Sequence, residues 1–219
     1  MKNILLIGAT GRTGSIFLEM ALDKGHQVSI LLRDKKKVTL THPKLRIIEG
    51  NPTKSSDVSE AMKGSDAVES TLNISRVTDS PWAQLTAPPD LLSASMTVVL
   101  QCMKEQGISR IIYVSASGVG DSSVEMPGWL RWFFNRTKIG ITYRDHQKTE
   151  DLLASSGVDW TSVRPVGLTD KDKVRELIVS RLGTPKPRWS ISRKHVAIFM
   201  LDILEKAEYI RQAPTISER

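Results

Sequence analysis

Cysteine is almost absent from this chain, because Cys102 is the only one in 219 residues. A single cysteine cannot form an internal disulfide, which excludes a secreted disulfide scaffold and favours a reducing compartment. Long hydrophobic runs are also missing: the run from Ile4 to Ile7 stops at Gly8, too short for a signal-peptide core, and no later run reaches membrane-spanning length without a charge. We therefore expect a cytoplasmic protein with no membrane partner.

Signatures of several other protein classes are missing as well. The chain has no G-x-S-x-G nucleophile elbow and no P-loop. Its histidines, His26, His42, His146 and His195, show no metal-ligand spacing with one another or with Cys102, so no metal site is expected. Helix-turn-helix, RNA-recognition and zinc-finger signatures are absent, so we expect no nucleic-acid partner, although the net charge of +7 raises the question.

The composition that remains is that of a globular protein, with 40% hydrophobic and 25% charged residues and no internal repeat or linker. Short apolar runs alternate with longer amphipathic ones, as strands and crossover helices do in a parallel sheet. The expected strands are Asn3 to Ile7, Gln27 to Leu32, Leu45 to Glu49, Ala67 to Leu72, Arg110 to Val114 and Asp159 to Val163. The expected helices are Arg12 to Lys24, Ser55 to Met62, Leu91 to Gln106, Tyr143 to Ser156 and Ser192 to Lys206. We predict a single α/β domain over residues 1–219, a doubly wound parallel sheet with helices on both faces.

The connections between these elements carry two further signals. A glycine suited to the left-handed cap follows four of the expected helices, at Gly25, Gly64, Gly107 and Gly157. Two long stretches without regular period, Asn73 to Asp90 and Gly118 to Gly140, each follow the carboxyl end of an expected strand. Open α/β sheets place their ligand loops at that edge, so we expect both stretches to be functional.

The strongest chemical signal is the run from Gly8 to Gly14, which has the spacing G-x-x-G-x-x-G directly after the first strand and at the start of the first helix. Glycine permits the tight turn and lets backbone N–H groups approach a pyrophosphate, and the helix N-terminus adds unpaired donors and a positive dipole end. In this position the motif predicts a dinucleotide site. The alternative is a tight turn that binds nothing.

The end of the second expected strand indicates which dinucleotide binds. Arg33 stands about 20 positions after the third glycine, where an acidic residue binds the ribose 2′-hydroxyl of NAD or an arginine accommodates the 2′-phosphate of NADP. Lysines follow it, and Arg12 is available from the glycine loop, which favours a phosphate. Asp34 keeps NAD open as the alternative. NADP(H) is the predicted cofactor.

Together with three later segments, these residues resemble the atypical short-chain dehydrogenase/reductase superfamily, in its NAD(P)H-binding, NmrA-like and flavin/biliverdin-reductase-like branch. The segments are Gly8 to Gly14 with Leu32 to Asp34, Gly107 to Ser117, Ser156 to Pro165, and Ile191 to Arg193 before Val196 and Ala197. The resemblance covers nearly the whole chain. It implies a Rossmann-like domain with a small C-terminal substrate lobe, built from loops 73–90 and 118–140 and from residues 165–219. It also implies NAD(P)H-dependent reduction of a small carbonyl, quinone or flavin-type substrate.

The resemblance also assigns cofactor contacts. For the phosphates it implies Gly8, Thr10, Gly11, Arg12 and Thr13, and for the 2′-phosphate Arg33. Asn51 stands near the adenine, where the family usually has an aspartate. Around the rest of the cofactor it implies Thr71, Leu72, Asn73, Ser115, Ala116, Ser117, Pro165, Val166 and Gly167. The amide of Asn51 can still donate or accept a hydrogen bond, so we expect cofactor binding to survive this difference.

The usual catalytic pair of the wider superfamily is not found in register. That pair is a Tyr and a Lys four residues apart, in which the Lys lowers the pKa of the phenol that serves as acid or base. If Glu150 aligns with the family's acidic residue, His146 takes the Lys position and Thr142 the Tyr position. Tyr143 lies one residue later, and its partner four residues on is Gln147, which is not a base.

Proton donation therefore stays open among several candidates. Ala116 interrupts Ser115 and Ser117 at the position of the serine that usually assists. Tyr143, His146, Ser117 or solvent could each supply the proton, and some relatives transfer hydride to flavins without an essential side-chain acid. Each of the two residues also has a structural alternative. Tyr143 could be an aromatic ring packed under the preceding loop 118–140, and His146 a helix-surface histidine paired with an acid.

The stretch before the expected helix Tyr143 to Ser156 interleaves aromatic and basic residues. They are Trp129, Trp132, Phe133 and Phe134 with Arg131, Arg136 and Lys138. Such a lid suits a planar, anionic small-molecule substrate held by stacking and by basic groups. The alternative is a short amphipathic helix whose aromatic side chains seal the core, and Trp82 in the other loop is a candidate to close the same pocket.

The excess positive charge is concentrated in two windows. Arg33 to Arg46 holds six basic residues and one acid, and Arg131 to Lys148 holds five and one. These are the predicted 2′-phosphate edge and the substrate lid, so the charge favours a nucleotide over a nucleic acid. We expect an NADP(H)-dependent oxidoreductase. Because the Tyr and Lys pair is missing, the alternative is a non-catalytic NADP(H) sensor of the NmrA kind.

Overall fold

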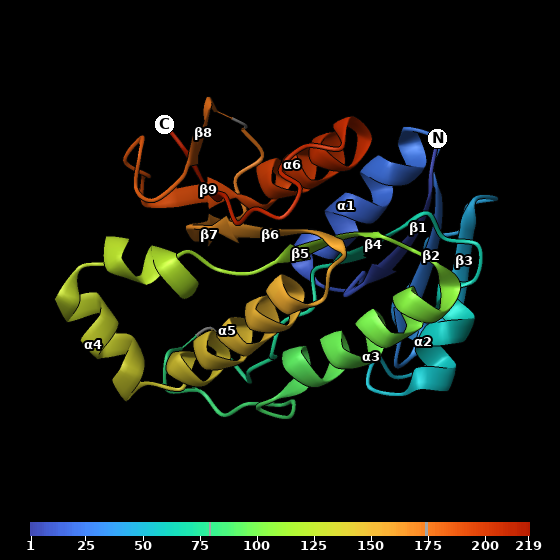
Figure 1. Ribbon diagram of the computed structural model, residues 1–219, viewed down its shortest axis with the longest axis horizontal. Coiled ribbons are helices and arrows are strands. Elements are labelled where there is room, and N and C mark those ends of the chain that lie inside the picture. Colours follow the sequence, from blue (N-terminus) through green and yellow to red (C-terminus); the bar gives the residue numbers. More distant parts are fainter. Residues whose placement is uncertain (79, 174) are drawn as a thin grey trace.

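The computed structural model describes residues 1–78, 80–173 and 175–219; position 79, in the expected loop 73–90, and position 174, in the expected lobe 165–219, lie outside the described residues. Its main sheet has eight strands in the order β3-β2-β1-β4-β5-β6-β10-β8 (Figure 1). The strands are β1 Asn3–Ile7, β2 Gln27–Leu32, β3 Leu45–Glu49, β4 Ala67–Ser70, β5 Arg110–Val114, β6 Asp159–Pro165, β8 Leu177–Ser180 and β10 Thr215–Glu218. The order reverses beside β1, which is the arrangement of a Rossmann-like doubly wound fold.

Helices cover both faces of this sheet, as predicted. They are α1 Arg12–Asp23, α2 Ser55–Met62, α3 Leu91–Gln106, α4 Gly128–Arg136, α5 Ile139–Ser155 and α6 Arg193–Lys206. Figure 1 shows α1 and α6 on one side and α2, α3 and α5 on the other. Each side has its own buried apolar cluster, with Phe17 and Leu201 in one and Val99 and Met103 in the other. The sheet is therefore buried between two helical layers along most of its width.

Most predicted element bounds are confirmed. β1, β2, β3, β5, α2 and α3 begin and end where the periodicity placed them. The four glycines expected at helix ends all have a left-handed φ, from +69° at Gly107 to +85° at Gly25. The main difference is α5, which begins at Ile139 instead of Tyr143 and is separated from α4 by an extended residue, Thr137.

Four strands and one helix were not predicted. β10 pairs in parallel with β6 and antiparallel with β8, so the sheet is parallel except at one edge. Two three-residue strands, β7 Gly167–Thr169 and β9 Ser190–Ser192, form a separate small sheet. α4 lies inside the stretch that was expected to be irregular. Strands of three or four residues are too short for periodicity to reveal, which explains why they were missed.

The parts outside the main sheet lie at the ends of its later strands. The small sheet β7–β9 follows β6, and α4 follows a 3-10 helix, Gly120–Glu125, after β5. Figure 1 shows α4 at the margin of the molecule, apart from the sheet. In the part of the chain that the structure describes, no helix has the length and apolar character needed to cross a membrane.

Candidate functional site

The glycine-rich turn lies at the carboxyl end of β1, and its shape depends on the absence of side chains. Gly8 has a φ of +93°, and a Cβ atom there would lie 2.8 Å from the backbone nitrogen of Leu72. A Cβ atom on Gly14 would lie 2.2 Å from the Gly8 carbonyl oxygen. The Gly11 N–H donates to that same oxygen at 3.0 Å, and the Thr71 hydroxyl donates to it at 3.1 Å. The turn is thus held against the end of β4 in one conformation.

This turn opens directly into α1, whose N-terminus is suited to an anion. Its N-cap residue is Gly11, which offers no side-chain cap, and the first turn contains no acidic residue. The first backbone N–H groups of the helix are therefore not occupied by a capping side chain or an internal carboxylate. A close-fitting glycine turn followed by such a helix end fits the pyrophosphate of a dinucleotide.

The end of β2 presents a cation beside this turn. The Arg33 side chain is exposed, and its guanidinium has no hydrogen bond or ion pair within the described residues. Asp34, the residue that kept NAD open, has one carboxylate oxygen occupied, because it accepts from the Lys36 N–H at 3.0 Å and caps a short 3-10 helix, Lys35–Lys37. The local structure therefore assigns Asp34 a capping contact and leaves Arg33 free.

Asn51 lies in the turn after β3. Its side-chain oxygen accepts from the N–H and the hydroxyl of Thr53, at 3.0 and 2.9 Å, and its own N–H donates to Asp57 at 2.8 Å. These bonds shape the turn through the side-chain oxygen. The side-chain NH2 group is the part that is left to contact an adenine, so the assignment of Asn51 stays a prediction with that group as the donor.

The predicted nicotinamide residues lie together at the ends of β5 and β6. The Ser115 N–H donates to the Val163 carbonyl at 2.7 Å, and the Ser117 N–H donates to the Pro165 carbonyl at 2.9 Å. These bonds extend the pairing of the two strands into the loops beyond them. The Ser115 hydroxyl is buried and has no hydrogen-bond partner in the described part of the chain. Of the remaining predicted contacts, Thr10, Asn73, Ala116 and Val166 lie in turns and loops at this same edge, Thr13 lies in the first turn of α1, and Gly167 begins β7.

Tyr143 lies on α5 against the loop that follows β5. Its hydroxyl donates to the Ser117 carbonyl at 3.1 Å, and its ring lies 5.0 Å from that of Phe134. Burial raises the pKa of Tyr143 to about 12. The phenol is therefore a weak acid whose proton is already shared with the backbone. The structure brings the two candidates Tyr143 and Ser117 together, while their catalytic roles stay predictions.

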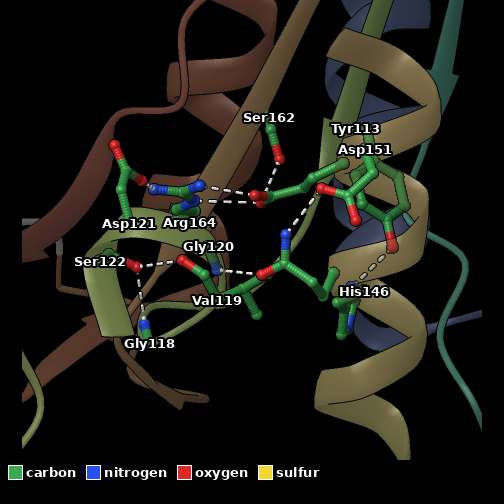
Figure 2. A network of polar contacts seen from close by, with 12 residues as sticks. Tyr113, Gly118, Val119, Gly120, Asp121, Ser122, His146, Asp151, Ser162 and Arg164 are labelled. Carbon is green, nitrogen blue, oxygen red and sulfur yellow. Dashed lines mark hydrogen bonds and ion pairs between the residues drawn. The ribbon is translucent and has the colours of Figure 1, made fainter. Parts of the chain in front are cut away.

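His146 is placed differently from the helix-surface histidine considered above. Its side chain is 3% exposed, and its Nδ1 lies 2.6 Å from the Tyr113 hydroxyl, not beside a carboxylate partner (Figure 2). Burial lowers its pKa to about 4. His146 is therefore neutral at pH 7 and joins α5 to β5 in the interior. The surface-histidine alternative is wrong, and burial argues against the catalytic role, which stays a prediction.

A buried charged network joins the loop after β5 to β6 and α5, and sequence reasoning missed it. The Arg164 guanidinium donates to both carboxylate oxygens of Glu150, at 3.0 and 2.5 Å, and to Asp121 on the other side (Figure 2). Ser162 donates to the same Glu150 carboxylate at 2.7 Å. The Gly120 N–H adds a bond of 2.7 Å to the side chain of Gln147. The loop that carries the predicted nicotinamide residues is therefore fixed by side chains from two other elements.

A second missed contact fixes the other end of α5. Asp145 is 2% exposed and accepts from the Leu92 N–H at 2.8 Å and from the Ser93 hydroxyl at 2.5 Å. It thereby caps α3 from a neighbouring helix, since the N-cap residue Asp90 makes no side-chain cap of its own. The signal in the sequence was an acidic residue on the buried face of an amphipathic helix, which needs a donor partner.

The aromatic residues of the lid divide into an inner and an outer set. Trp129 and Trp132 on α4 are 69% and 62% exposed, and the Arg136 guanidinium lies 5.6 Å from the Trp132 ring. Phe133 and Phe134 are half-buried, and Trp82 contacts Phe133 edge-on at 5.6 Å. The lid is an amphipathic helix that Trp82 of the other long loop contacts, while the closing of a substrate pocket by Trp82 stays a prediction.

Comparisons with known proteins agree with this geometry. A family model described as NAD(P)H-binding matches residues 8–207. An uncharacterized chloroplastic protein of Arabidopsis thaliana is 25% identical over 213 residues, 94% of this chain and 73% of that protein. A Veillonella parvula short-chain dehydrogenase/reductase solved with NADP is 19% identical with a TM-score of 0.82, over 99% of this chain and 94% of that one. The Escherichia coli anaerobillin reductase ChuY is 21% identical with a TM-score of 0.78, over 99% and 97%.

Proposed function

The chain belongs to the NAD(P)H-binding family, and from that premise we propose that it is an NADPH-dependent oxidoreductase that transfers hydride to a small carbonyl, quinone or flavin-type substrate. The observation that carries the proposal is the glycine turn, in which a Cβ on Gly14 would lie 2.2 Å from a backbone oxygen, beside the Arg33 guanidinium, which has no partner among the described residues. A turn with no room for a side chain, opening into a helix, suits a pyrophosphate.

The parts of the site have separate roles in this proposal. The glycine turn and the first N–H groups of α1 bind the pyrophosphate, and Arg33 binds the 2′-phosphate. The paired loops at Ser115 to Ser117 and Pro165 to Gly167 orient the nicotinamide ring and exclude water from one face. The bound cofactor supplies the hydride, and the protein supplies orientation and electrostatics.

The surroundings of Tyr143 and His146 favour substrates that need no strong acid from the protein. With a pKa of about 12 for Tyr143 and about 4 for His146, neither group changes its charge near neutral pH. A catalytic acid works best when its pKa lies near the working pH. Flavin-type and quinone substrates accept hydride at a conjugated ring and can take their proton from solvent, so we place them ahead of simple carbonyls.

The lid supports a planar substrate. Exposed tryptophans and half-buried phenylalanines offer stacking surfaces beside the loop that would hold the nicotinamide, and Arg131 and Arg136 add positive charge. The name of the structural neighbour ChuY, an anaerobillin reductase, describes a reductase of the same fold. We therefore extend the proposal to planar, anionic acceptors.

The cofactor part is tested by titrating NADPH and NADH into the wild type and Arg33→Ala. A charge-assisted hydrogen bond contributes roughly 1.5–3 kcal/mol, so Arg33→Ala should weaken the binding of NADPH by about ten-fold or more and the binding of NADH much less. Lys36→Ala removes a charge from the adjoining solvated turn and serves as the matched control. An equal loss for both cofactors in Arg33→Ala would show that this residue does not recognise the 2′-phosphate.

The reaction is tested by following NADPH oxidation with FMN, small quinones and aldehydes. We expect oxidation with FMN or a quinone, and a Tyr143→Phe variant that retains activity within a few-fold at pH 7. A loss of activity by two orders of magnitude in Tyr143→Phe would make the phenol the proton donor, since general acid catalysis is worth about that much.

The missing Tyr and Lys pair also supports a second candidate, a non-catalytic NADP(H) sensor. Its test is a partner protein whose affinity for the chain differs between the NADP-bound and NADPH-bound forms. NADPH binding without oxidation of NADPH by any acceptor would favour this candidate, and an affinity that does not depend on the redox state of the cofactor would remove it.

A further inference from the structure

Two arginines from opposite ends of the chain converge on one exposed carboxylate beside the glycine turn. Arg12 is the first residue of α1, and Arg193 is the first residue of α6. The Arg193 Nη1 lies 2.5 Å from one oxygen of Asp170, and the Arg12 Nη1 lies 3.5 Å from the other. Asp170 directly follows β7, in the segment after the predicted nicotinamide residues. The carboxylate is therefore bridged by two cations at the start of α1.

The three side chains differ greatly in burial. The side chain of Arg193 is only 10% exposed, whereas those of Arg12 and Asp170 are 55% and 64% exposed. A buried guanidinium needs an anionic partner to offset its loss of hydration, and its planar set of N–H groups can donate to a carboxylate or to a phosphate. The buried partner is thus fixed in place, while the anion that satisfies it sits in an exposed segment that can be displaced.

We propose that Asp170 is an internal anion that occupies the place of a cofactor phosphate oxygen, and that dinucleotide binding transfers Arg12 and Arg193 from Asp170 to the pyrophosphate. Arg193 is then a pyrophosphate-binding residue in addition to those of the glycine turn. Asp170 and a pyrophosphate cannot both lie close to the start of α1 without repulsion between like charges. Cofactor binding must therefore break the Asp170 contacts, which lowers the apparent affinity.

The inference rests on dinucleotide binding and not on hydride transfer. The pyrophosphate is common to NADH and NADPH, so a change at Asp170 or Arg193 should alter the affinity for both cofactors by the same factor. A change at Arg33 should instead separate them. The ratio of the NADH and NADPH dissociation constants therefore distinguishes this anion site from the 2′-phosphate site.

The decisive experiment is calorimetric titration of NADPH and NADH into the full chain and Asp170→Asn, which keeps the shape of the side chain and removes its charge. Both cofactors should bind about 3- to 10-fold more tightly to Asp170→Asn, because the anion that competes with the pyrophosphate for the two guanidiniums loses its charge. Asp172→Asn makes the same charge change two residues further on, where the described residues show no ion pair, and should shift the affinities by less than two-fold.

Unchanged or weaker binding to Asp170→Asn would overturn the proposal, and so would an equal gain in Asp172→Asn, which would indicate a general charge effect. In the same titration Arg193→Gln should weaken the binding of NADPH and of NADH by the same factor. When Asp170→Asn and Arg193→Gln are combined, the gain in affinity from Asp170→Asn should be smaller, as expected for coupled residues. Thermal unfolding checks that Arg193→Gln is folded. If this variant does not fold, the affinities of Asp170→Asn alone test the proposal. A lack of NADPH oxidation would contradict the proposed reaction and leave these binding shifts unaffected.

Discussion

The two ends of the ligand-binding edge are shaped by different parts of the chain. At the β1 end, the backbone itself forms the site: glycines approach within van der Waals distance of strand ends, and the Gly8 carbonyl accepts from the Gly11 N–H and the Thr71 hydroxyl. At the β5 and β6 end, the backbone is held by side chains far apart in sequence, above all Arg164 with Asp121 and Glu150. We call these the backbone end and the side-chain end.

The difference explains where each end is sensitive to substitution. The backbone end tolerates no added atoms, because its contacts are already as close as carbon and oxygen allow. The side-chain end depends on a balance of buried charges, which is lost if one partner is removed. The variants below are chosen to disturb one end at a time.

The largest effect is expected from Arg164→Met at the side-chain end. It leaves the Glu150 carboxylate buried with Ser162 as its donor and frees the loop at Asp121. Breaking a buried ion pair by removing one partner costs about 3–5 kcal/mol, which denaturant unfolding measures. Arg181→Met is the matched control, since Arg181 is exposed at the cavity beside this network and has no side-chain ion pair within the described residues. Equal losses for both variants would contradict the distinction between the two ends.

The next effect is a pH dependence that comes from His146, which is bonded to Tyr113 on β5. His146 has a pKa of about 4 in the folded protein and 6.5 when it is not perturbed, so the unfolded chain binds a proton first as the pH falls. This histidine therefore contributes full stability above pH 6.5, and about 3 kcal/mol is lost as the pH falls from 6.5 to 4.

Urea unfolding of the wild type and His146→Gln between pH 4 and 7 measures this loss. The wild type should be destabilised more steeply over that range than His146→Gln, whose side chain can still bond to the Tyr113 hydroxyl but does not titrate. His42→Gln, in a half-buried surface turn, should keep the wild-type slope. A wild-type slope that survives in His146→Gln would assign the pH dependence to other groups.

The smallest change in stability is expected from Gly14→Ala at the backbone end, although it should abolish cofactor binding. The added Cβ would lie 2.2 Å from the Gly8 oxygen and 2.6 Å from the Thr71 hydroxyl, so the turn must move. Overpacking of this kind costs about 1–3 kcal/mol. Gly128→Ala, where a Cβ meets nothing within 4 Å, is the control and should bind NADPH normally. Normal binding by Gly14→Ala would show that the turn is not the cofactor site.

The backbone end could be predicted from the sequence because its determinants are local. Strand, glycine turn and helix follow one another within Asn3 to Asp23, and both the periodicity and the glycine spacing are properties of neighbouring residues. The left-handed glycines at helix ends follow the same logic. What such patterns predict is the path of the backbone, which at this end also defines the candidate site.

The side-chain end could not be predicted, because its contacts join residues that no local pattern connects. Arg164 lies 14 residues from Glu150 and 43 from Asp121 in sequence. One signal was available, since a charged residue inside the buried strand at Arg164 requires a partner, but the sequence does not say which carboxylate it is. The surface alternative for His146 was wrong for a similar reason, because an amphipathic pattern does not distinguish a polar residue in solvent from one that bonds to a buried hydroxyl.

The position of β10 has a consequence for how the protein is made. Residues 215–218 form the strand that joins β6 to β8, although both of those strands are synthesised before it. Until residues 215–218 have left the ribosome and docked, β6 has an unpaired edge and β8 has no neighbour in the sheet. An exposed edge of this kind can pair with another nascent chain. Docking of β10 is therefore the step that closes the sheet, and a chain that has not reached it keeps an exposed edge at β6.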